Sequence, residues 1–547
     1  MNVMKNHFGM IWESVADAVP EQIAVVQGDR RVTWGDYEAN AARLAQACLD
    51  AGLGPHSKVG MYLYNSPEYC ETNFAAVKFR GVPINVNYRY LDDELHYLLE
   101  NADIECLVFH SSLGDRVARV KDRLPMLKLL VEVDDGPAAD GSQGVAGAVT
   151  YDDLQANTTP ADRIEPQGDE IYMFYTGGTT GMPKGVMYDM ENFSTFFIEG
   201  YPAMVGLEPF GGAADMAGKA RELADADMRA IAMSGPPLMH GTGCWIGLMA
   251  PHLLGGTSVL LESRSLDAAE MWGTIEREGV KSLIIVGDAF AKPMVRALED
   301  NPGKWDTTPL GMIISSGAMF STDVKQQLIA QAPHLVIADV LGSTEGGMGQ
   351  QITTKDTPLG ETAKFGASPT TKVFTDDDRE VVPGSGEVGA VANGGLVPLG
   401  YYKDEEKSAR TFRTIDGVRY AFIGDMAMIE ADGTMTLLGR GSNCINTGGE
   451  KVFPEEVEEA LKVNAAVEDA LVFGVPDDRF GNRVVGVVSM APEATSADPA
   501  EVIAETKQRL SSYKLPKELV VVDRIPRAPN GKADYPSAKE LFESAGA

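Results

Sequence analysis

The sequence has little cysteine and no pair of cysteines in a C-x-x-C arrangement. Its five cysteines are scattered through 547 residues, at positions 48, 70, 106, 244 and 444. This scatter argues against a disulfide framework and against a zinc site built from cysteine pairs. We therefore expect reduced and buried thiols, and Cys444 deserves separate notice because it falls inside a motif described below.

Long apolar runs are also missing. No stretch reaches the ~18 uninterrupted apolar residues of a membrane-spanning helix, and the first residues lack the apolar core and cleavage site of a signal peptide. We expect a cytoplasmic protein.

Positive charge is scarce, with 47 Lys and Arg against 79 Asp and Glu, which gives a formal net charge of −32. Such a surface repels nucleic acid and anionic lipid, so neither is an expected partner. An anionic small molecule would be repelled as well. Any site for one must gather local positive charge, and Lys184, Arg440 and Lys532 are candidates.

The Walker phosphate-loop pattern is absent, but a different glycine-rich stretch is present. Residues 175–186 read Tyr-Thr-Gly-Gly-Thr-Thr-Gly-Met-Pro-Lys-Gly-Val and follow an apolar run at 171–174. A Walker loop needs glycine before its lysine and a hydroxyl after it, whereas Pro183 and Gly185 stand there. Glycines with positive φ let the backbone approach a ligand, while threonine hydroxyls, amides and a lysine donate to phosphate oxygens. The stretch predicts a phosphate loop made of Thr176, Gly177, Gly178, Thr179, Thr180, Gly181 and Lys184. A ligand-free turn between a strand and a helix is the alternative.

The length and the 44% hydrophobic content predict more than one domain. From Lys58 to about residue 345, short apolar strands alternate with helical segments, which predicts α/β layers around a largely parallel sheet. Short β segments split by Gly and Pro follow. Glycines on both sides of Arg440 predict a hinge, with residues 1–439 as a large domain and 440–547 as a small α+β domain. In the small domain we expect a helix at 454–462, strands near 470–473 and 484–488, and a helix at 499–510 capped by Asp498.

The phosphate-loop motif resembles the signature of the adenylate-forming superfamily, which includes acyl-CoA synthetases, peptide-synthetase adenylation domains and luciferases. Further motifs follow in the order that this resemblance implies. It implies an α/β fold, with a large multi-sheet N-terminal domain and a small, mobile α+β C-terminal domain.

The resemblance also implies a nucleotide site. The stretch Leu341-Gly342-Ser343-Thr344-Glu345 is similar to the family pattern Tyr-Gly-x-Thr-Glu. By this resemblance, Thr344 would donate to phosphate and Glu345 would anchor Mg²⁺. This cation typically takes one or two carboxylates plus substrate phosphates. Leu341 replaces the usual aromatic residue. The segment of Ser316, Gly317 and Ala318 resembles one that lines the adenine and acyl pockets. The alternative is that it forms a plain strand-to-helix turn without a ligand. The implied AMP-binding set is completed by Gly342, Ser343 and two ribose contacts, Asp425 and Arg440.

The resemblance also implies where the carboxylic acid and the thiol of CoA would bind. Met239 and His240 match a segment that borders the acyl pocket, and Trp245 and Phe320 would suit a bulky hydrophobic acid, although ordinary core is the alternative. Gly448 and Gly449 would leave space for a thiol tunnel. Lys532 resembles the terminal-motif lysine that stabilises charge on the reacting carboxylate and α-phosphate, so it is the principal catalytic candidate. At the hinge, Ser442, Asn443 and Asn446 depart from the charged residues of many relatives.

These motifs together resemble an acyl-CoA synthetase that uses ATP, Mg²⁺ and CoA, most similar to actinobacterial ligases for long-chain and sterol side-chain acids. The expected partners are small molecules, and a homodimer remains an alternative to a monomer. Two other functions stay open. One is an adenylation enzyme that loads a carrier protein in trans, since no carrier domain follows Ala547. The other is an acyl-adenylate-binding protein without turnover, which the altered hinge would suit.

Overall fold

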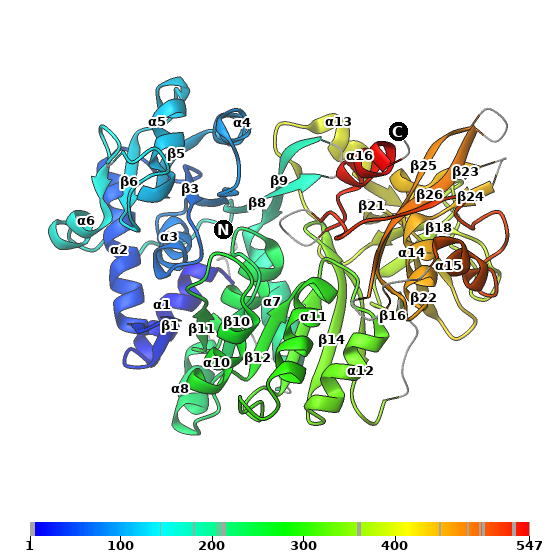
Figure 1. Ribbon diagram of the computed structural model, residues 1–547. Coiled ribbons are helices and arrows are strands. Elements are labelled where there is room, and N and C mark those ends of the chain that lie inside the picture. Colours follow the sequence, from blue (N-terminus) through cyan, green and yellow to red (C-terminus); the bar gives the residue numbers. More distant parts are fainter. Residues whose placement is uncertain are drawn as a thin grey trace.

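The structure is a computed structural model, drawn in Figure 1. It describes residues 6–142, 144–178, 181–204, 207–208, 215–357, 363–447, 450–477, 481–491, 494, 498–527 and 532–545. Four expected site residues, Thr179, Thr180, Gly448 and Gly449, lie outside these ranges. No helix within them is long and apolar enough to cross a membrane.

The N-terminal part holds a parallel sheet in the order β4-β3-β5-β6-β7. Its central strand β5 is buried at every position, as expected of a parallel strand covered by helices on both faces. The strands are β3 (Lys58–Tyr62), β4 (Val82–Asn85), β5 (Ile104–His110), β6 (Leu129–Val133) and β7 (Val149–Thr150). The helices of this part are α1 (Phe8–Ala18), α2 (Trp34–Asp50), α3 (Pro67–Lys78), α4 (Asp92–Asn101), α5 (Gly114–Val120) and α6 (Tyr151–Asn157).

A second, larger sheet begins as a parallel one and is built from the next alternating strands and helices. Its core includes Trp272, which is fully buried and whose Nε1 donates to the carbonyl oxygen of Met294, 3.0 Å away, tying α10 to α11. The strands of this half are β2 (Arg30–Thr33), β1 (Ile23–Gln27), β11 (Thr257–Leu260), β10 (Ile231–Ser234), β12 (Ser282–Ile285), β13 (Met312–Ser316) and β14 (Val336–Ser343), of which only β2 is antiparallel to its neighbour. The helices are α8 (Met216–Asp225), α9 (Ala250–His252), α10 (Ala268–Glu278), α11 (Gly287–Asp300) and α12 (Thr322–Gln331).

The same sheet continues as an antiparallel one beyond β14. The expected short β segments after residue 360 are present, but they extend the parallel sheet rather than forming a separate layer, because β15 turns back beside β14 and exposes its other edge to β16. The prediction of a largely parallel sheet therefore holds only up to β14. The added strands are β15 (Gly346–Thr353), β16 (Lys364–Ala367), β22 (Thr434–Arg440), β21 (Val418–Ile429), β18 (Gly389–Asn393), β17 (Thr371–Phe374) and β20 (Phe412–Ile415), and helix α13 (Glu405–Thr411) directly precedes β20.

The predicted phosphate loop lies in a β-hairpin and not between a strand and a helix. Strands β8 (Ile171–Gly178) and β9 (Gly181–Asp189) pair antiparallel, and β19 (Gly400–Tyr401) pairs with the outer edge of β9. Helix α7 (Met190–Met204) follows β9 directly. In Figure 1 this hairpin lies near the middle of the molecule, between the blue N-terminal part and the orange and red C-terminal part.

The C-terminal part has the expected α+β composition. Helix α14 (Pro454–Lys462) matches its prediction, and Asp498 caps α15 (Pro499–Thr506) by accepting a hydrogen bond from the amide of Ala500 at 2.9 Å. The predicted end of α15 at residue 510 is wrong, because the regular α-helical bonding is interrupted after Thr506, where the amides of Gln508 and Arg509 donate to carbonyl oxygens only three residues back. The other elements are β23 (Ile445–Thr447), β24 (Glu450–Val452), β25 (Val467–Asp477), β26 (Gly481–Met490), β27 (Leu519–Val521) and α16 (Tyr535–Ala545).

All five cysteines are free, as expected. Four are buried, and Cys444, which follows β22, is partly exposed.

Candidate active site

A cavity of about 920 Å³ opens where the carboxyl ends of the parallel strands meet the phosphate hairpin and the C-terminal part. Ligands of open α/β sheets typically bind outside the carboxyl ends of the strands. Many residues that the sequence singled out line this cavity: Thr176, Gly177, Met239, His240, Trp245, Ser316, Gly317, Gly342, Ser343, Thr344 and Lys532.

Asn85, which the sequence analysis did not identify, fixes the base of the phosphate hairpin. Its Nδ2 donates to the carbonyl oxygens of Tyr175 (2.8 Å) and Met239 (2.7 Å), and its Oδ1 accepts from the amide of Tyr175 at 2.7 Å. The residue is 4% exposed at the end of β4. One buried amide thus holds the hairpin against the loop that carries His240. The sequence signal for this residue was that a polar side chain ends the otherwise apolar strand 82–85.

Gly185 of the hairpin serves close packing rather than a left-handed backbone, whereas a Cβ on Gly177 would meet nothing within 4 Å among the described residues. Neither Gly177 nor Gly185 has a positive φ, so that part of the expectation is wrong for these two. A Cβ on Gly185 would stand 2.7 Å from the sulfur of Met173 and 2.8 Å from the ring of Tyr175. Lys184 pairs in register with Thr176, outside the cavity lining, and its ammonium lies 5.6 Å from the centre of the Tyr401 ring.

The Glu345 carboxylate is held on both oxygens at the end of β14. Ser343 Oγ donates to Oε2 at 3.0 Å, and the Tyr401 hydroxyl donates to Oε1 at 2.8 Å. The Tyr188 hydroxyl donates to the carbonyl oxygen of the adjacent Thr344 at 2.7 Å. No group of three or more His, Cys, Asp or Glu in the described ranges could hold a metal ion alone. A single oriented carboxylate nevertheless suits Mg²⁺ that is also held by substrate phosphates.

Asp425 and Lys532 belong to one group of charges with Glu345 and Arg440. Burial raises the pKa of Asp425, Arg440 and Lys532 oppose this rise, and Glu345 adds to it. Burial lowers the pKa of Lys532, Arg440 lowers it further, and the two carboxylates oppose the change. Because Lys532 as a whole residue is exposed, solvent screens part of this effect. The tertiary structure therefore brings together charges that lie up to 187 residues apart in the chain.

His240 lines the same cavity as Lys532. Burial lowers its pKa to about 4, and the nearby cations Lys532 and Arg89 lower it as well. The imidazole is therefore neutral at neutral pH, so it can orient a carboxylate by hydrogen bonding but cannot pair with it as a cation.

Aromatic side chains form an apolar wall of the cavity. Trp245 lies on the π-helix η4 (Thr242–Met249), and its Nε1 donates to the Tyr172 hydroxyl at 3.1 Å. Phe193 of α7 stacks on Tyr172, with ring centres 4.5 Å apart. The sequence analysis missed the contribution of α7, although the spacing of its aromatic residues was available as a signal.

Several predicted residues are absent from the lining of this cavity, namely Lys184, Ala318, Phe320, Glu345, Asp425 and Arg440. Phe320 is 1% exposed in the core beside α12, with the Lys325 ammonium 5.2 Å from its ring centre, so its placement in the acyl pocket is wrong. Ala318 lines a second cavity instead. The chain turns away from the first cavity directly after Gly317, whose φ is +95°.

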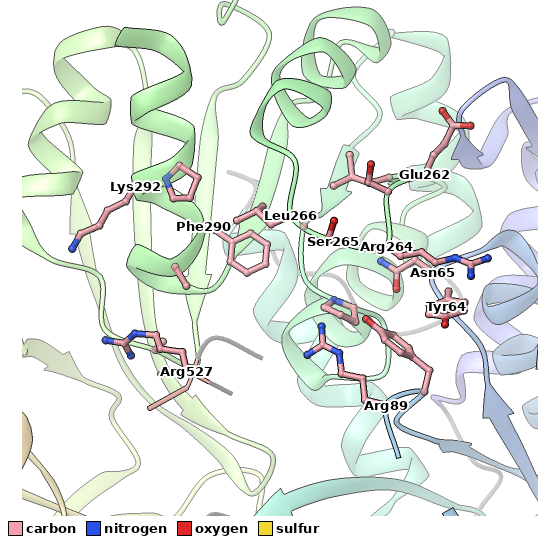
Figure 2. A pocket seen from close by; sticks show the side chains of 18 of the residues that line it. Tyr64, Asn65, Arg89, Glu262, Arg264, Ser265, Leu266, Phe290, Lys292 and Arg527 are labelled. Atoms are coloured by element: carbon pink, nitrogen blue, oxygen red, sulfur yellow. The ribbon is translucent and has the colours of Figure 1, made fainter. Parts of the chain in front are cut away.

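The second cavity, of about 1180 Å³, lies beside the first and shares Pro237 and Phe290 with it. Figure 2 shows Arg89 and Arg264 on one side of it and Lys292 and Arg527 on the other. Its walls come from the N-terminal sheet, the parallel sheet and the C-terminal part, which is why no local sequence pattern indicated it.

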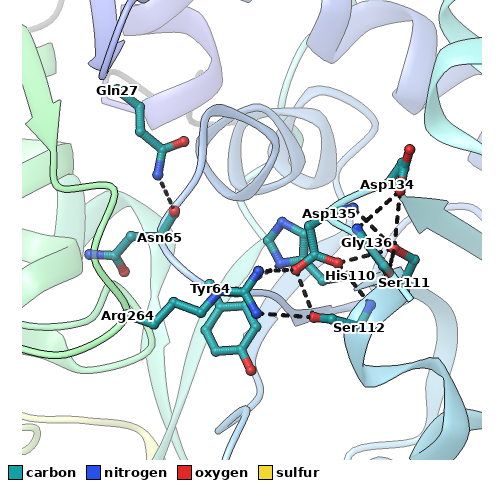
Figure 3. A network of polar contacts seen from close by, with 10 residues as sticks. All are labelled: Gln27, Tyr64, Asn65, His110, Ser111, Ser112, Asp134, Asp135, Gly136 and Arg264. Atoms are coloured by element: carbon teal, nitrogen blue, oxygen red, sulfur yellow. Dashed lines mark hydrogen bonds and ion pairs between the residues drawn. The ribbon is translucent and has the colours of Figure 1, made fainter. Parts of the chain in front are cut away.

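A polar network rigidifies one wall of the second cavity (Figure 3). The Arg264 guanidinium lies 4.1 Å from the Tyr64 ring centre and donates to Asp135 at 2.6 Å. Asp135 also accepts from the amide (2.8 Å) and the hydroxyl (2.7 Å) of Ser112. In contrast, Nη1 of Arg89 is buried and has no hydrogen-bond partner among the described residues.

Comparison with known proteins agrees with this arrangement. Residues 12–402 match the AMP-binding enzymes, and residues 456–532 match the AMP-binding enzyme C-terminal domain. A medium/long-chain-fatty-acid–CoA/3-oxocholest-4-en-26-oate–CoA ligase of Mycolicibacterium smegmatis is 40% identical over 538 residues, covering 97% of this chain and 95% of the relative. A 3-oxocholest-4-en-26-oate–CoA ligase of Rhodococcus rhodochrous is 40% identical over 535 residues, covering 96% and 94%.

Solved structures share the fold. The anthranilate CoA ligase AuaEII in complex with anthranoyl-AMP superposes with a TM-score of 0.83 at 20% identity, covering 99% of this chain and 98% of that one. The o-succinylbenzoate CoA synthetase MenE of Bacillus subtilis, in complex with its acyl-adenylate intermediate, has a TM-score of 0.75 at 20% identity and 97% coverage of both chains. The predicted fold class is confirmed. The chain belongs to the AMP-binding enzyme family, and within it to the ATP-dependent, AMP-forming acyl-CoA ligases.

Proposed function

We propose that this ligase activates a hydrophobic carboxylic acid, either a medium- to long-chain acid or one carried on a steroid side chain. The observation that carries the proposal is one cavity that is lined both by Thr176, Gly177, Thr344 and Lys532 and by the aromatic side chains of Phe193, Phe197 and Trp245. The names of the two relatives at 40% identity support the same acids.

The polar end of the cavity suits ATP. We assign the phosphates to the hairpin and Thr344, the base to the strand ends of β13 and β14, and the ribose to the ion pair on β21 and β22. Of the residues concerned, Thr176 and Gly177 for phosphate and Ser316, Gly317, Gly342 and Ser343 for the base line the cavity, and Asp425 pairs with Arg440 for the ribose. The phosphate-binding roles of Gly178, Thr179, Thr180, Gly181 and Lys184 stay predictions. Ala318, which lines the second cavity, is left out of this assignment.

In the first step a carboxylate oxygen attacks the α-phosphorus, the bond to the bridging oxygen breaks, and pyrophosphate leaves. Lys532 would hold the carboxylate against the phosphate and stabilise the charge that develops there. When bound, Mg²⁺ would neutralise phosphate charge. Glu345, oriented by Ser343 and Tyr401, would hold it. Neutral His240, with Met239 and Trp245, would border the acid.

In the second step the CoA thiol loses its proton to solvent, its sulfur bonds to the acyl carbonyl carbon, the bond from that carbon to the phosphate oxygen breaks, and AMP leaves. The second cavity supports a route for CoA, because Pro237 and Phe290 line both cavities and a thiol arm passing between them would reach the acyl group. The unpartnered Nη1 of Arg89 suits an anionic group of CoA. The tunnel role of Gly448 and Gly449 stays a prediction.

We also propose that residues 440–547 rotate as a small domain on residues 1–439 between the two steps. Gly439 supports a hinge here, because its φ is +117° and a Cβ would collide with the Glu455 carboxylate. Strand β22 ends at Arg440, the proposed boundary.

A panel of acids tests the function. The purified enzyme, ATP, Mg²⁺ and CoA are incubated with butyrate, dodecanoate, hexadecanoate, benzoate and a steroid side-chain acid, and acyl-CoA and AMP are quantified. We expect equal amounts of both products, highest with the long-chain or steroid acids. Acid-dependent pyrophosphate release without acylation of free CoA would favour loading of a carrier protein. Binding of acyl-AMP with no pyrophosphate release from any acid would favour the protein without turnover.

A further inference from the structure

Helix α7 presents one face to the active-site cavity, and that face has a gap. Phe193, Phe196, Phe197, Gly200 and Tyr201 all line the cavity. Their spacing of three and four residues puts them on one side of the helix. Four of the five are aromatic, whereas Gly200 has no side chain.

No side chain among the described residues fills this gap. Phe193 is fixed by ring contacts with Tyr172 (4.5 Å), Tyr188 (4.9 Å) and Phe197 (5.2 Å). Within the part of the chain that the structure describes, a Cβ on Gly200 would meet no atom within 4 Å. Gly200 itself lines the cavity, so this space is continuous with it.

The backbone does not require glycine at this position. Gly200 does not have a positive φ, so an L-amino acid fits its conformation. Glycine inside a helix is also less stable than alanine. Its presence is therefore better explained by the space that it leaves than by the local structure.

Gly200 lies far along the cavity from the reacting groups. Phe193 touches Tyr188, whose hydroxyl bonds to the carbonyl oxygen of Thr344 beside the phosphate-binding end. Seven residues of α-helix separate Phe193 from Gly200, a rise of roughly 10 Å. Gly200 and the 47% exposed Phe196 both reach the surface, so the cavity meets solvent along this part of α7.

We infer that Gly200 is a specificity-determining residue. Its missing side chain leaves room for acids whose apolar part extends to the far end of α7, such as long chains and fused rings, while short acids end before it. The inference rests on the proposed function, in which this cavity binds the acid.

The test compares Gly200→Leu with Gly218→Leu. Gly218 is a matched control, because it too is an exposed helical glycine whose Cβ would meet nothing within 4 Å, but it lies on α8 and does not line the cavity. Both substitutions replace a helical glycine, so both variants are expected to fold and to keep or raise the melting temperature. Acyl-CoA formation is measured for butyrate and hexadecanoate with each variant.

We expect Gly200→Leu to lower kcat/KM for hexadecanoate by roughly 10- to 200-fold, the range for a change of a few methylene-sized volumes in an apolar pocket. Butyrate should change by less than about twofold, since discrimination at the far end leaves the reacting end untouched. Gly218→Leu should leave both acids unchanged. Equal losses for both acids, or no loss for hexadecanoate, would overturn the inference while the wild-type activity still stands. If the wild-type enzyme forms no acyl-CoA from any acid, it is the proposed function that fails.

Discussion

Asp425 and Arg440 face each other across the antiparallel pair β21–β22, with Nε of the arginine 3.7 Å from Oδ1 of the aspartate. Fifteen residues separate them in the chain, and the turn between the strands aligns them. The aspartate is 8% exposed, whereas the arginine is partly exposed. At this separation the two groups make an ion pair without a short hydrogen bond to each other.

Replacing this carboxylate should weaken nucleotide binding. Asp425→Asn removes a charged acceptor for two hydroxyls, and hydrogen bonds to charged groups contribute about 1.5–3 kcal/mol, which corresponds to roughly 10- to 100-fold. We expect KM for ATP to rise by this factor in pyrophosphate exchange. Asp416→Asn is the control, because Asp416 lies in the β20–β21 turn with φ +50°, a conformation that asparagine tolerates. An unchanged KM for ATP in Asp425→Asn would contradict the ribose assignment.

Removing the ammonium of Lys532 should affect the two steps differently. Lys532→Ala should lower adenylation by roughly 10²–10³, the usual cost of losing one electrostatic donor at the transition state. Thioester formation from supplied acyl-AMP should fall much less. Lys507→Ala changes an exposed lysine in the same C-terminal part and should leave both steps unchanged. Equal losses in the two steps would instead indicate a structural role for Lys532.

Glu71 should make stability depend on pH. Its carboxylate is buried, accepts from Asn40 Nδ2 (2.8 Å) and the Tyr151 hydroxyl (2.5 Å), and burial raises its pKa from 4.5 to about 7. Between these values the folded protein binds a proton that the unfolded chain has lost, so the free energy of unfolding falls as pH rises from about 4.5 to 7.

Glu71→Gln keeps the shape of the side chain and removes this titration. Between pH 4.5 and pH 7, the free energy of unfolding of the wild type should fall by on the order of 3 kcal/mol more than that of the variant, since one pKa unit is worth about 1.4 kcal/mol. Urea unfolding at both pH values measures it. Parallel pH profiles for the two proteins would contradict the raised pKa.

The C-terminal part is attached to α11 by a contact that should favour adenylation. Lys292 Nζ donates to the backbone oxygen of Glu468 at 2.7 Å, and Arg296 pairs with the Glu468 carboxylate. Figure 2 shows Lys292 on the α11 side of the second cavity. In this arrangement Lys532 lines the active-site cavity. The contact therefore stabilises the arrangement in which Lys532 lines this cavity.

Reversing one charge of this pair should lower pyrophosphate exchange modestly. An exposed ion pair contributes about 0.2–1 kcal/mol, so Glu468→Arg should reduce the rate by up to roughly fivefold, and less at high salt. Arg296→Glu combined with Glu468→Arg should restore most of the rate. Failure of the double variant to recover, with normal melting temperature, would show that the ion pair does not act on this arrangement.

The sequence alone determined the family and most local structure. The order of the motifs, the strand and helix alternation up to residue 345, helix α14 and the Asp498 cap depend on short-range patterns, which the sequence displays directly. Prediction from the sequence failed where the position of a side chain depends on the direction in which the chain turns. Phe320 has the right character for an acyl pocket, but the turn after Gly317 sends it into the core.

What only the tertiary structure decided is which distant groups meet. Asn85 joins the phosphate hairpin to the His240 loop, and Tyr401 orients Glu345, each across more than fifty residues of chain. The antiparallel strands join the parallel sheet through β15, and the second cavity draws its walls from three parts of the fold. These pairings depend on sheet order and register, which arise from burial summed over the whole molecule and leave no pattern at any single stretch of sequence.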